Sequence, residues 1–149
     1  MNLERLQRLG IDFGAYLGID ASEEMLERAR AKLAGDPRVD LRLGDVTHLS
    51  GIEGRFDFVV STWVLSHLDD PFAVVRDATR RLTPGGRAVF LFSGTPRSRL
   101  LRACLWPFYR WADARFIDPE PLRELPELEA LERRSGGLAT LAVLRPSAA

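Results

Sequence analysis

The sequence predicts an α/β protein whose sheet is mostly parallel and ends in an antiparallel hairpin. Apolar runs alternate along the chain with segments of helical periodicity, which is the order expected when helices connect parallel strands. Two of the runs, FDFVV and AVFLF, are continuously apolar, as is typical of strands buried on both faces. The last two apolar segments flank Gly136-Gly137, a pair that favours a hairpin turn.

The first half of the chain is expected to contain two helices and two strands. In chain order these are a helix at 2–9, a strand at 15–20, a helix at 23–33 and a strand at 39–43. Ser22 is suited to cap the second helix, whose first turn is acidic and therefore complements the helix dipole. The core-facing side of that helix is expected to carry Met25, Leu26, Ala29 and Leu33.

The second half of the chain continues the alternation and ends in the hairpin. In chain order it predicts a strand at 56–61, a helix at 72–82, a strand at 87–93, a partly helical segment at 95–116, a short capped segment at 119–125, and hairpin strands at 128–134 and 138–144. Thr83-Pro84-Gly85-Gly86 is expected to end the helix and turn the chain tightly into the next strand, which is a structural role.

Length and composition limit the classes of function. The chain has 149 residues, which predicts a single domain over 1–149. It carries 21 basic and 21 acidic residues, so no charge excess indicates nucleic acid as a partner. The single cysteine, Cys104, excludes an internal disulfide and a cysteine-based zinc cluster, and no metal site is expected. No apolar stretch is long enough to span a membrane and the N-terminus lacks the apolar core of a signal peptide, so we expect a cytoplasmic location.

Two carboxylates are expected at the same edge of the sheet, because Asp20 ends one strand and Asp45 follows the next. In folds of this type ligands bind beyond the carboxyl ends of the strands. Asp20 could there accept hydrogen bonds from both hydroxyls of a ribose, and Asp45 could accept one from an adenine amino group. The structural alternatives are that Asp20 only caps the next helix and that Asp45 is only a turn residue.

Small polar residues and a histidine follow the strand at 56–61. Ser61 and Thr62 suit the close approach of a ligand at the strand exit. His67 is better explained as a hydrogen-bonded packing residue than as a general base, although histidine is the common base in catalysis. No catalytic residue is assigned.

The segment 95–116 combines aromatic residues with arginines. The aromatic residues are Trp106, Phe108, Tyr109, Trp111 and Phe116, and the arginines are Arg97, Arg99, Arg102, Arg110 and Arg115. The segment forms either a lid over an apolar or anionic small molecule or an amphipathic helix that packs on the sheet with its aromatic residues in the core. The pattern favours the packed helix. Basic residues interleaved with aromatic ones also occur in nucleic-acid-binding proteins, but the balanced charge argues against that function.

Five of these segments, taken in order, resemble class I S-adenosylmethionine-dependent methyltransferases, of the group related to small-molecule and quinone methyltransferases. The matching stretches are YLGIDASEEMLERARAKL, VDLRLGDVTHL, FDFVVSTWVLSHLDDP and RDATRRLTPGGRAVFLFSG, followed by the terminal hairpin. The resemblance covers nearly the whole chain. It implies a Rossmann-like fold, S-adenosylmethionine as the cofactor and a small-molecule methyl acceptor.

The resemblance also implies roles for individual residues. Asp20 would hold the ribose, Ala21 and Met25 would line the adenine, Asp45 would meet the adenine amino group with the backbone of Val46 beside it, and Ser61 and Thr62 would approach the sulfonium end.

The first strand and the glycine-rich loop of the family have no counterpart in this sequence. The chain is therefore expected to be an N-terminally truncated methyltransferase domain in which the segment 2–9 matches the helix after the loop. Without a central strand, either the two strands that would flank it pair directly, or their edges are vacant and a second copy of the chain or another polypeptide fills the gap. The loop normally brings backbone close to the cofactor, so we expect the isolated chain to bind S-adenosylmethionine weakly.

Three functions remain open from the sequence. The first is methyl transfer to a small molecule, impaired in this chain alone, for which precise positioning of donor and acceptor can suffice. The second is a non-catalytic or partner-dependent methyltransferase-like subunit. The third is a nicotinamide-dependent oxidoreductase, in which Asp20 would also serve. It is the weakest, because Asp45 and the LTPGG turn match methyltransferases better.

Overall fold

The computed structural model describes residues 3, 8–33 and 35–147, and the chain divides into two compact units, Met1–Ile52 and Glu53–Ala149. Most of the helix expected at 2–9 lies outside the described residues. The fold is mixed α/β, with parallel strand pairs in both units and antiparallel strands at the end of the chain, as the sequence predicts.

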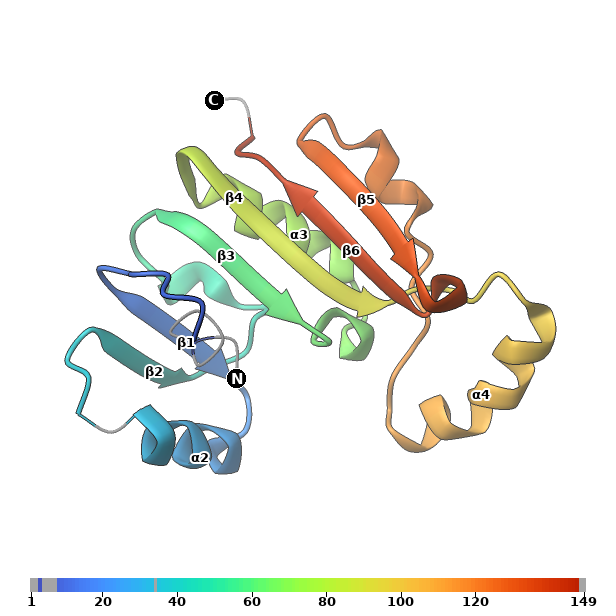
Figure 1. Ribbon diagram of the computed structural model, residues 1–149, viewed down its shortest axis with the longest axis horizontal. Helices are drawn as coiled ribbons and strands as arrows, with labels where there is room; N and C mark the ends of the chain where they lie inside the picture. The colour runs from blue at the N-terminus through green and yellow to red at the C-terminus, as the bar shows by residue number, and fades with distance from the viewer. Residues whose placement is uncertain (1–2, 4–7, 34, 148–149) are drawn as a thin grey trace. The chain divides into compact units, whose positions relative to one another are not determined.

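In its described residues, the first unit contains a two-stranded parallel sheet with the helix α2 beside it (Figure 1). Its elements are β1 (Tyr16–Asp20), α2 (Glu23–Leu33), β2 (Val39–Leu43) and a 3-10 turn at Leu49–Gly51. The predicted strand at 39–43 and helix at 23–33 are confirmed, and the strand expected at 15–20 begins one residue later. Ser22 caps α2 as predicted, because its Oγ accepts a hydrogen bond of 3.3 Å from the backbone N–H of Met25.

The buried face of α2 is narrower than the sequence predicts. Leu26, Ala29 and Leu33 are buried, whereas the side chain of Met25 is exposed. The three buried residues are spaced by three and four positions and form one helical stripe, from which Met25 is displaced. The expectation that Met25 shares the core-facing side is therefore wrong.

The second unit is built on a four-stranded sheet with the strand order β3-β4-β6-β5. Its elements are β3 (Phe56–Thr62), a 3-10 turn at Leu65–His67, α3 (Pro71–Arg80), β4 (Leu82–Ser93), α4 (Arg99–Trp111), a 3-10 turn at Glu120–Glu124, β5 (Leu128–Arg134), a 3-10 turn at Ser135–Gly137 and β6 (Ala139–Leu144). β3 and β4 are parallel, and β6 is antiparallel to both β4 and β5, which confirms the terminal hairpin.

One face of this sheet forms the core of the second unit. Phe90 and Phe92 of β4 are buried on it, together with Ala142 and Leu144 of the neighbouring β6. α3 runs behind the sheet in Figure 1. Phe58, on β3, is exposed, so the expectation that FDFVV is buried on both faces is wrong. The described helix α3 covers one face, and side chains alternate between the faces of a strand.

The helix expected at 72–82 spans 71–80, and the following strand begins at Leu82 instead of Arg87. The Thr83-Pro84-Gly85-Gly86 stretch belongs to β4, because Phe56 pairs with Leu82 and the register shifts before Phe58 pairs with Arg87. The extra residues form an irregularity in the strand instead of a separate tight turn. Gly85 has a φ of 86°, a conformation that favours glycine.

The segment 95–116 is helical in part, as predicted, but its packing differs from the prediction. No residue of α4 is buried, and the side chains of Trp106, Phe108 and Trp111 are exposed. Amphipathic spacing shows that a helix has an apolar face, but it does not show whether another element covers that face. The expectation that these aromatic residues form core is therefore wrong.

Candidate functional site

The carboxyl ends of β1 and β2 bring four of the predicted site residues to one end of the first unit. Asp20 pairs with Leu43 as the last residue pair of the sheet, and the N–H of Gly44 donates a 3.0 Å hydrogen bond to the carbonyl of Asp20. Asp45 follows directly after Gly44. The structure thus places Asp20, Ala21, Asp45 and Val46 at the same end of the two strands.

The carboxylate of Asp20 is partly buried and partly engaged. Its Oδ1 accepts a 2.9 Å hydrogen bond from the backbone N–H of Ser22, which fixes the turn from β1 into α2. In the described part of the chain, that is the one hydrogen bond to this carboxylate. Oδ2 consequently keeps acceptor capacity at the end of β1. The helix-start role and the ligand role are therefore compatible.

Asp45 is more exposed and more fully engaged. Its Oδ1 accepts a 2.8 Å hydrogen bond from the backbone N–H of Thr47, and its Oδ2 lies 3.3 Å from Nδ1 of His48. The backbone N–H of Thr47 is the main reason that the pKa of Asp45 is lowered from its ordinary value. The carboxylate is therefore ionised at neutral pH and serves only as an acceptor.

Three further predicted residues of the first unit provide apolar surface. Ala21 and Met25 are exposed, and Val46 is half-buried. Met25 lies in the first turn of α2, where its backbone N–H donates to Ser22, so its side chain begins close to the end of β1. The assignment of these residues to an adenine ring remains a prediction.

Ser61 and Thr62 are the last residues of β3 in the second unit, and both are half-buried. The next residue, Trp63, has a φ of 67°, which is strained for a bulky side chain. Its N–H donates a 2.7 Å hydrogen bond to the carbonyl of Leu91, so the strained conformation is held by β4. Its side chain is 48% exposed. The sequence did not indicate Trp63, because nothing in the pattern reveals a positive φ at a tryptophan.

His67 is held by a loop beyond α4. Its Nδ1 lies 3.0 Å from the backbone carbonyl of Asp113, and a carbonyl only accepts, so Nδ1 carries the proton of this hydrogen bond. The neighbouring Ser66 is buried, and its carbonyl accepts a 2.7 Å hydrogen bond from the N–H of Arg115. The turn after β3 thus ties down the segment that follows α4, a structural use of His67.

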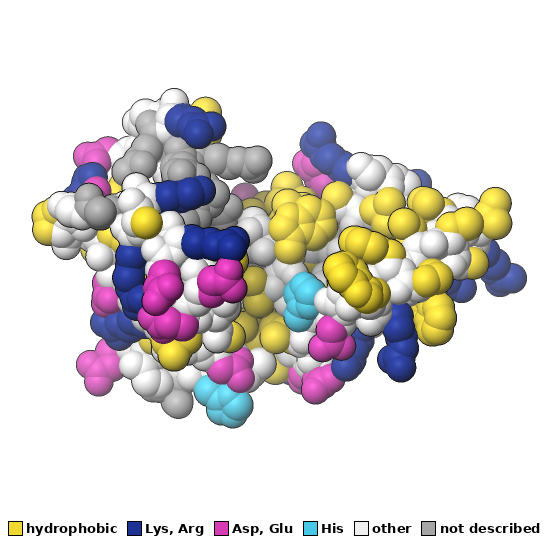
Figure 2. Space-filling view, turned by 90° about the horizontal axis from the view of Figure 1, so that it is seen from below, with side chains coloured by type: hydrophobic (Ala, Val, Ile, Leu, Met, Phe, Trp, Pro, Cys, Tyr) yellow, Lys and Arg dark blue, Asp and Glu magenta, His cyan; other side chains and the backbone are white. Residues whose placement is uncertain are grey.

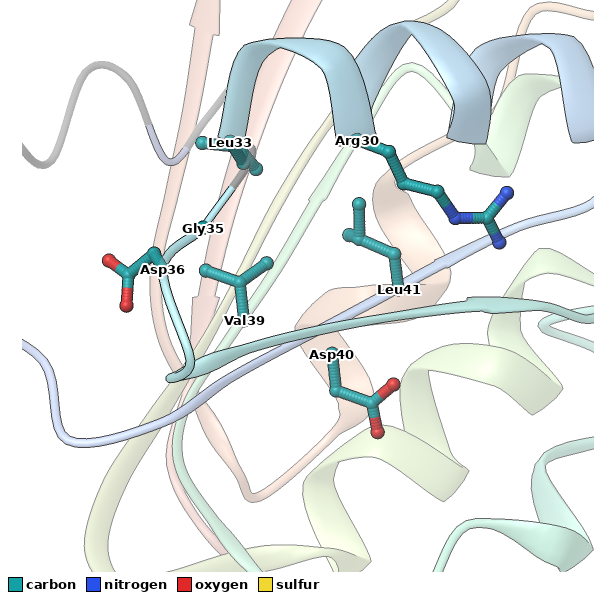
Figure 3. A pocket seen from close by; sticks show the side chains of 7 residues that line it. All are labelled: Arg30, Leu33, Gly35, Asp36, Val39, Asp40 and Leu41. Carbon is teal, nitrogen blue, oxygen red and sulfur yellow. The ribbon is translucent and has the colours of Figure 1, made fainter.

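A pocket of about 370 Å³ lies elsewhere in the first unit (Figure 3). Val39 and Leu41 point from β2 toward α2, whereas Asp40 points away from that helix. The pocket lies at the amino end of β2, opposite the end that Asp45 follows, and no predicted site residue lines it. We therefore place the candidate site at the carboxyl ends of the strands instead of in this pocket.

The described residues contain neither a cluster suited to a metal ion nor a helix that could span a membrane. In residues 3, 8–33 and 35–147, no group of three or more His, Cys, Asp or Glu side chains could hold a metal ion. Within the same residues, no helix has the length and apolar character needed to cross a bilayer.

Sequence comparison finds a methyltransferase family and methyltransferase relatives. A family model described as a methyltransferase domain matches residues 1–90. The demethylmenaquinone methyltransferase of Desulfitobacterium hafniense is 31% identical over 112 residues, which is 73% of this chain and 44% of that protein. An uncharacterized 37.1 kDa protein in a transposon of Streptomyces fradiae is 41% identical over 76 residues, or 51% of this chain and 22% of that protein. The chain thus spans less than half the length of the first curated relatives it matches.

Solved structures agree on the fold. The methyltransferase that forms a complex with the Trm112 activator of Haloferax volcanii has a TM-score of 0.75 at 18% identity, over 97% of this chain and 77% of that one. The N-methyltransferase NodS of Bradyrhizobium japonicum in complex with S-adenosylhomocysteine has a TM-score of 0.65 at 19% identity, over 90% of this chain and 67% of that one. These likenesses support a Rossmann-like methyltransferase fold.

Proposed function

The chain belongs to the methyltransferase domain family and is of the class I S-adenosylmethionine-dependent type, and we propose that it takes part in methyl transfer from S-adenosylmethionine to a small molecule. The observation that carries this proposal is the Asp20 carboxylate, held at the end of β1 with one oxygen used by the turn and one available. When bound, the cofactor supplies an electrophilic methyl group on a sulfonium.

The residues at the ends of β1 and β2 fit the nucleoside part of this cofactor. Asp20 Oδ2 has acceptor capacity that suits a ribose hydroxyl, and the Ser22 N–H holds the carboxylate in one orientation. Asp45 is kept ionised by Thr47 and can accept from the exocyclic amino group of adenine. Ala21, Met25 and the backbone of Val46 would flank the base. This fit rests on donor and acceptor chemistry, because the carboxylates are acceptors and the nucleoside offers donors.

In the second unit, we assign positioning roles to the end of β3. Ser61 and Thr62 would approach the sulfonium end, and the next residue, Trp63, has a strained backbone and an exposed side chain. In-line methyl transfer depends mainly on alignment of donor and acceptor, so a dedicated base is not required for every acceptor. We propose no base, because the hydrogen bond of His67 Nδ1 to the Asp113 carbonyl gives this residue a structural use.

The acceptor we propose is a small apolar molecule. The support is the group of relatives named demethylmenaquinone methyltransferases, two of which are 31% identical to this chain. The proposed location is the cytoplasm, with which the exposed free thiol of Cys104 is compatible.

A second candidate is a subunit whose activity depends on another polypeptide. Among the described residues, β1 pairs with β2 alone and β3 pairs with β4 alone, so each strand has an edge on which no described strand lies. Exposed strand edges can accept a strand from another chain. The methyltransferase from Haloferax volcanii that resembles this chain is solved in complex with an activator protein. We accordingly propose that the isolated chain binds its cofactor weakly.

The proposal is tested by an NMR titration of the isotope-labelled chain with S-adenosylhomocysteine. The titration is carried into the millimolar range, because a millimolar dissociation constant corresponds to a binding free energy of only about 4 kcal/mol. We expect the amide signals of Ala21, Gly44 and Val46 to shift, and D20A to abolish these shifts. D40A is the matched control, because Asp40 also lies in the first unit, on β2, but its carboxylate forms an ion pair with Arg42. Equal binding by the wild type and D20A would refute the assigned site.

The same titration separates the remaining alternatives. Micromolar binding by the wild type would contradict the proposed weak binding and leave the site intact. Shifts caused by NAD at the same amides, without any caused by S-adenosylhomocysteine, would favour a nicotinamide-dependent enzyme. Sedimentation velocity of the pure chain shows whether a second copy fills the strand edges: a dimer would favour this form of the partner-dependent candidate.

A further inference from the structure

α4 is part of an excursion from the sheet of the second unit. The excursion begins at Thr95, shortly after β4, and ends at Ile117, where the N–H of Thr95 donates a 2.9 Å hydrogen bond to the carbonyl of Ile117. Between these residues α4 extends outward from the end of the four-stranded sheet (Figure 1). We propose that α4 is an interfacial helix that binds the surface of a lipid bilayer containing anionic headgroups. This inference goes beyond methyl transfer and does not depend on it.

The first observation is an exposed apolar stripe along α4. Leu100, Cys104, Phe108 and Trp111 are spaced by three or four residues and lie on one side of the helix. Leu100 is 75% exposed, Phe108 60% and Trp111 83%. Figure 2 shows hydrophobic side chains gathered over this region of the second unit. Such a stripe is large enough to enter the boundary between headgroups and acyl chains.

The second observation is the charge of the remaining surface of the helix. Arg97, Arg99, Arg102 and Arg110 lie in or beside α4, and none of them forms an ion pair within the part of the chain that the structure describes. Elsewhere, many arginines are paired with carboxylates, as Arg30 is with Glu23. The segment 95–111 contains no acidic residue. Although the whole chain is neutral, this helix is strongly basic and complements an anionic surface.

The third observation is that α4 is anchored with its stripe turned outward. Leu101, Leu105 and Tyr109 are half-buried and lie on the side of the helix toward the body of the second unit. The hydroxyl of Tyr109 donates a 3.0 Å hydrogen bond to Ser93 Oγ, and its ring lies 4.0 Å from the ring of Phe116. The helix is therefore oriented by its inner side, and the stripe is not available for packing on this sheet.

The composition of the stripe favours lipid over nucleic acid. Leucine cannot stack on bases, whereas leucine, phenylalanine and tryptophan opposite arginine are the residues of interfacial helices. α4 has 13 residues, so it is too short to span a bilayer but suited to lie in the plane of its surface.

The experiment measures binding to large unilamellar vesicles of phosphatidylcholine with and without phosphatidylglycerol, by co-sedimentation. We expect binding to the anionic vesicles that weakens as salt is added. R99Q/R102Q/R110Q is expected to lower the partition coefficient about 100-fold, because each arginine near an anionic surface contributes about fivefold. R28Q/R80Q/R123Q removes the same number of charges from other exposed sites and is expected to leave binding unchanged within about twofold.

The single cysteine supplies a readout that does not depend on folding of a variant. A polarity-sensitive fluorophore on Cys104, in the exposed stripe, is expected to shift to the blue and brighten on anionic vesicles. The same fluorophore in C104S/R80C, on α3, is expected to show no change. L100S/F108S/W111S, checked for native circular dichroism, is expected to abolish vesicle binding.

The proposal is overturned if the fluorophore on Cys104 does not respond to anionic vesicles, or if both arginine variants lose binding equally. It is also overturned if the stripe proves to be a contact between two copies, seen as a dimer that W111S dissociates in the absence of lipid. Binding of single-stranded DNA without binding of vesicles would contradict the lipid assignment. S-adenosylhomocysteine is not needed for any of these readouts, so they are independent of the proposed enzymatic site.

Discussion

Substitution of Gly94 by alanine tests how tightly the end of β4 is packed. Gly94 is the residue after β4, and its N–H donates a 3.1 Å hydrogen bond to the carbonyl of Leu138. A Cβ at this position would lie 2.2 Å from Oγ1 of Thr140 and 2.5 Å from the carbonyl oxygen of Gly137. Both distances are far below van der Waals contact, so the terminal hairpin and β4 cannot keep their present separation in G94A.

The size of the effect follows from which atoms must move. Thr140 is fully buried, and the Gly137 oxygen belongs to the backbone of the hairpin turn, so neither group can rotate away. Overpacking of this kind costs about 1–3 kcal/mol. For a chain of this size, each kcal/mol lowers the melting temperature by about 2–4 °C, so G94A is expected to melt about 5 °C below the wild type.

The assay is thermal unfolding followed by circular dichroism. G51A is the control, because a Cβ at Gly51 would have no neighbour within 4 Å, and it is expected to melt as the wild type does. T140A in the G94A background removes the closer of the two clashes and is expected to recover part of the loss. A melting temperature for G94A within about 1 °C of the wild type would mean a loss of less than 1 kcal/mol in the free energy of unfolding, and would refute the predicted clash.

Three other variants test separate parts of the account. In T140V, removal of a buried Oγ1 that has no hydrogen-bond partner among the described residues is expected to raise the free energy of unfolding by about 1 kcal/mol, measured in urea; destabilisation would contradict this. Y109F is expected to lose about 1 kcal/mol and to make α4 more sensitive to limited proteolysis, because Ser93 loses its donor; unchanged cleavage would contradict the anchoring role. Burial raises the pKa of Tyr16, so this side chain ionises more readily in the unfolded state than in the folded state. The folded protein therefore keeps its full stability below the ordinary tyrosine pKa and loses stability as pH rises above about 10. Y16F should show a flatter loss of stability with pH, by up to about 1.4 kcal/mol per unit, and an identical slope would contradict the burial argument.

The first unit was largely predictable because its signals are local. Ser22 caps α2 through its own hydroxyl. Asp20 ends β1 and Asp45 follows β2, and the composition of both strands predicts them as strands. These features depend on residues within a few positions of one another. The same holds for the turn at Gly136-Gly137, which the hairpin strands flank.

Features of the second unit that depend on distant partners were not predictable. The start of β4 at Leu82 is set by pairing with Phe56, which no local pattern around Leu82 reveals. The exposure of Trp111 depends on whether any other element covers α4, and the positive φ of Trp63 depends on its hydrogen bond to Leu91. Tertiary contacts determined the outcome in each of these cases.

We propose above all that Asp20 holds the cofactor of a methyltransferase. The most direct measurement is the dissociation constant of S-adenosylhomocysteine for the wild type and for D20A, obtained from the amide shifts of Ala21 and Gly44. One charge-assisted hydrogen bond from a ribose hydroxyl to Asp20 Oδ2, worth about 1.5–3 kcal/mol, predicts that D20A weakens binding by more than about tenfold. Dissociation constants that agree within about twofold, a difference below 0.5 kcal/mol, would contradict the claim.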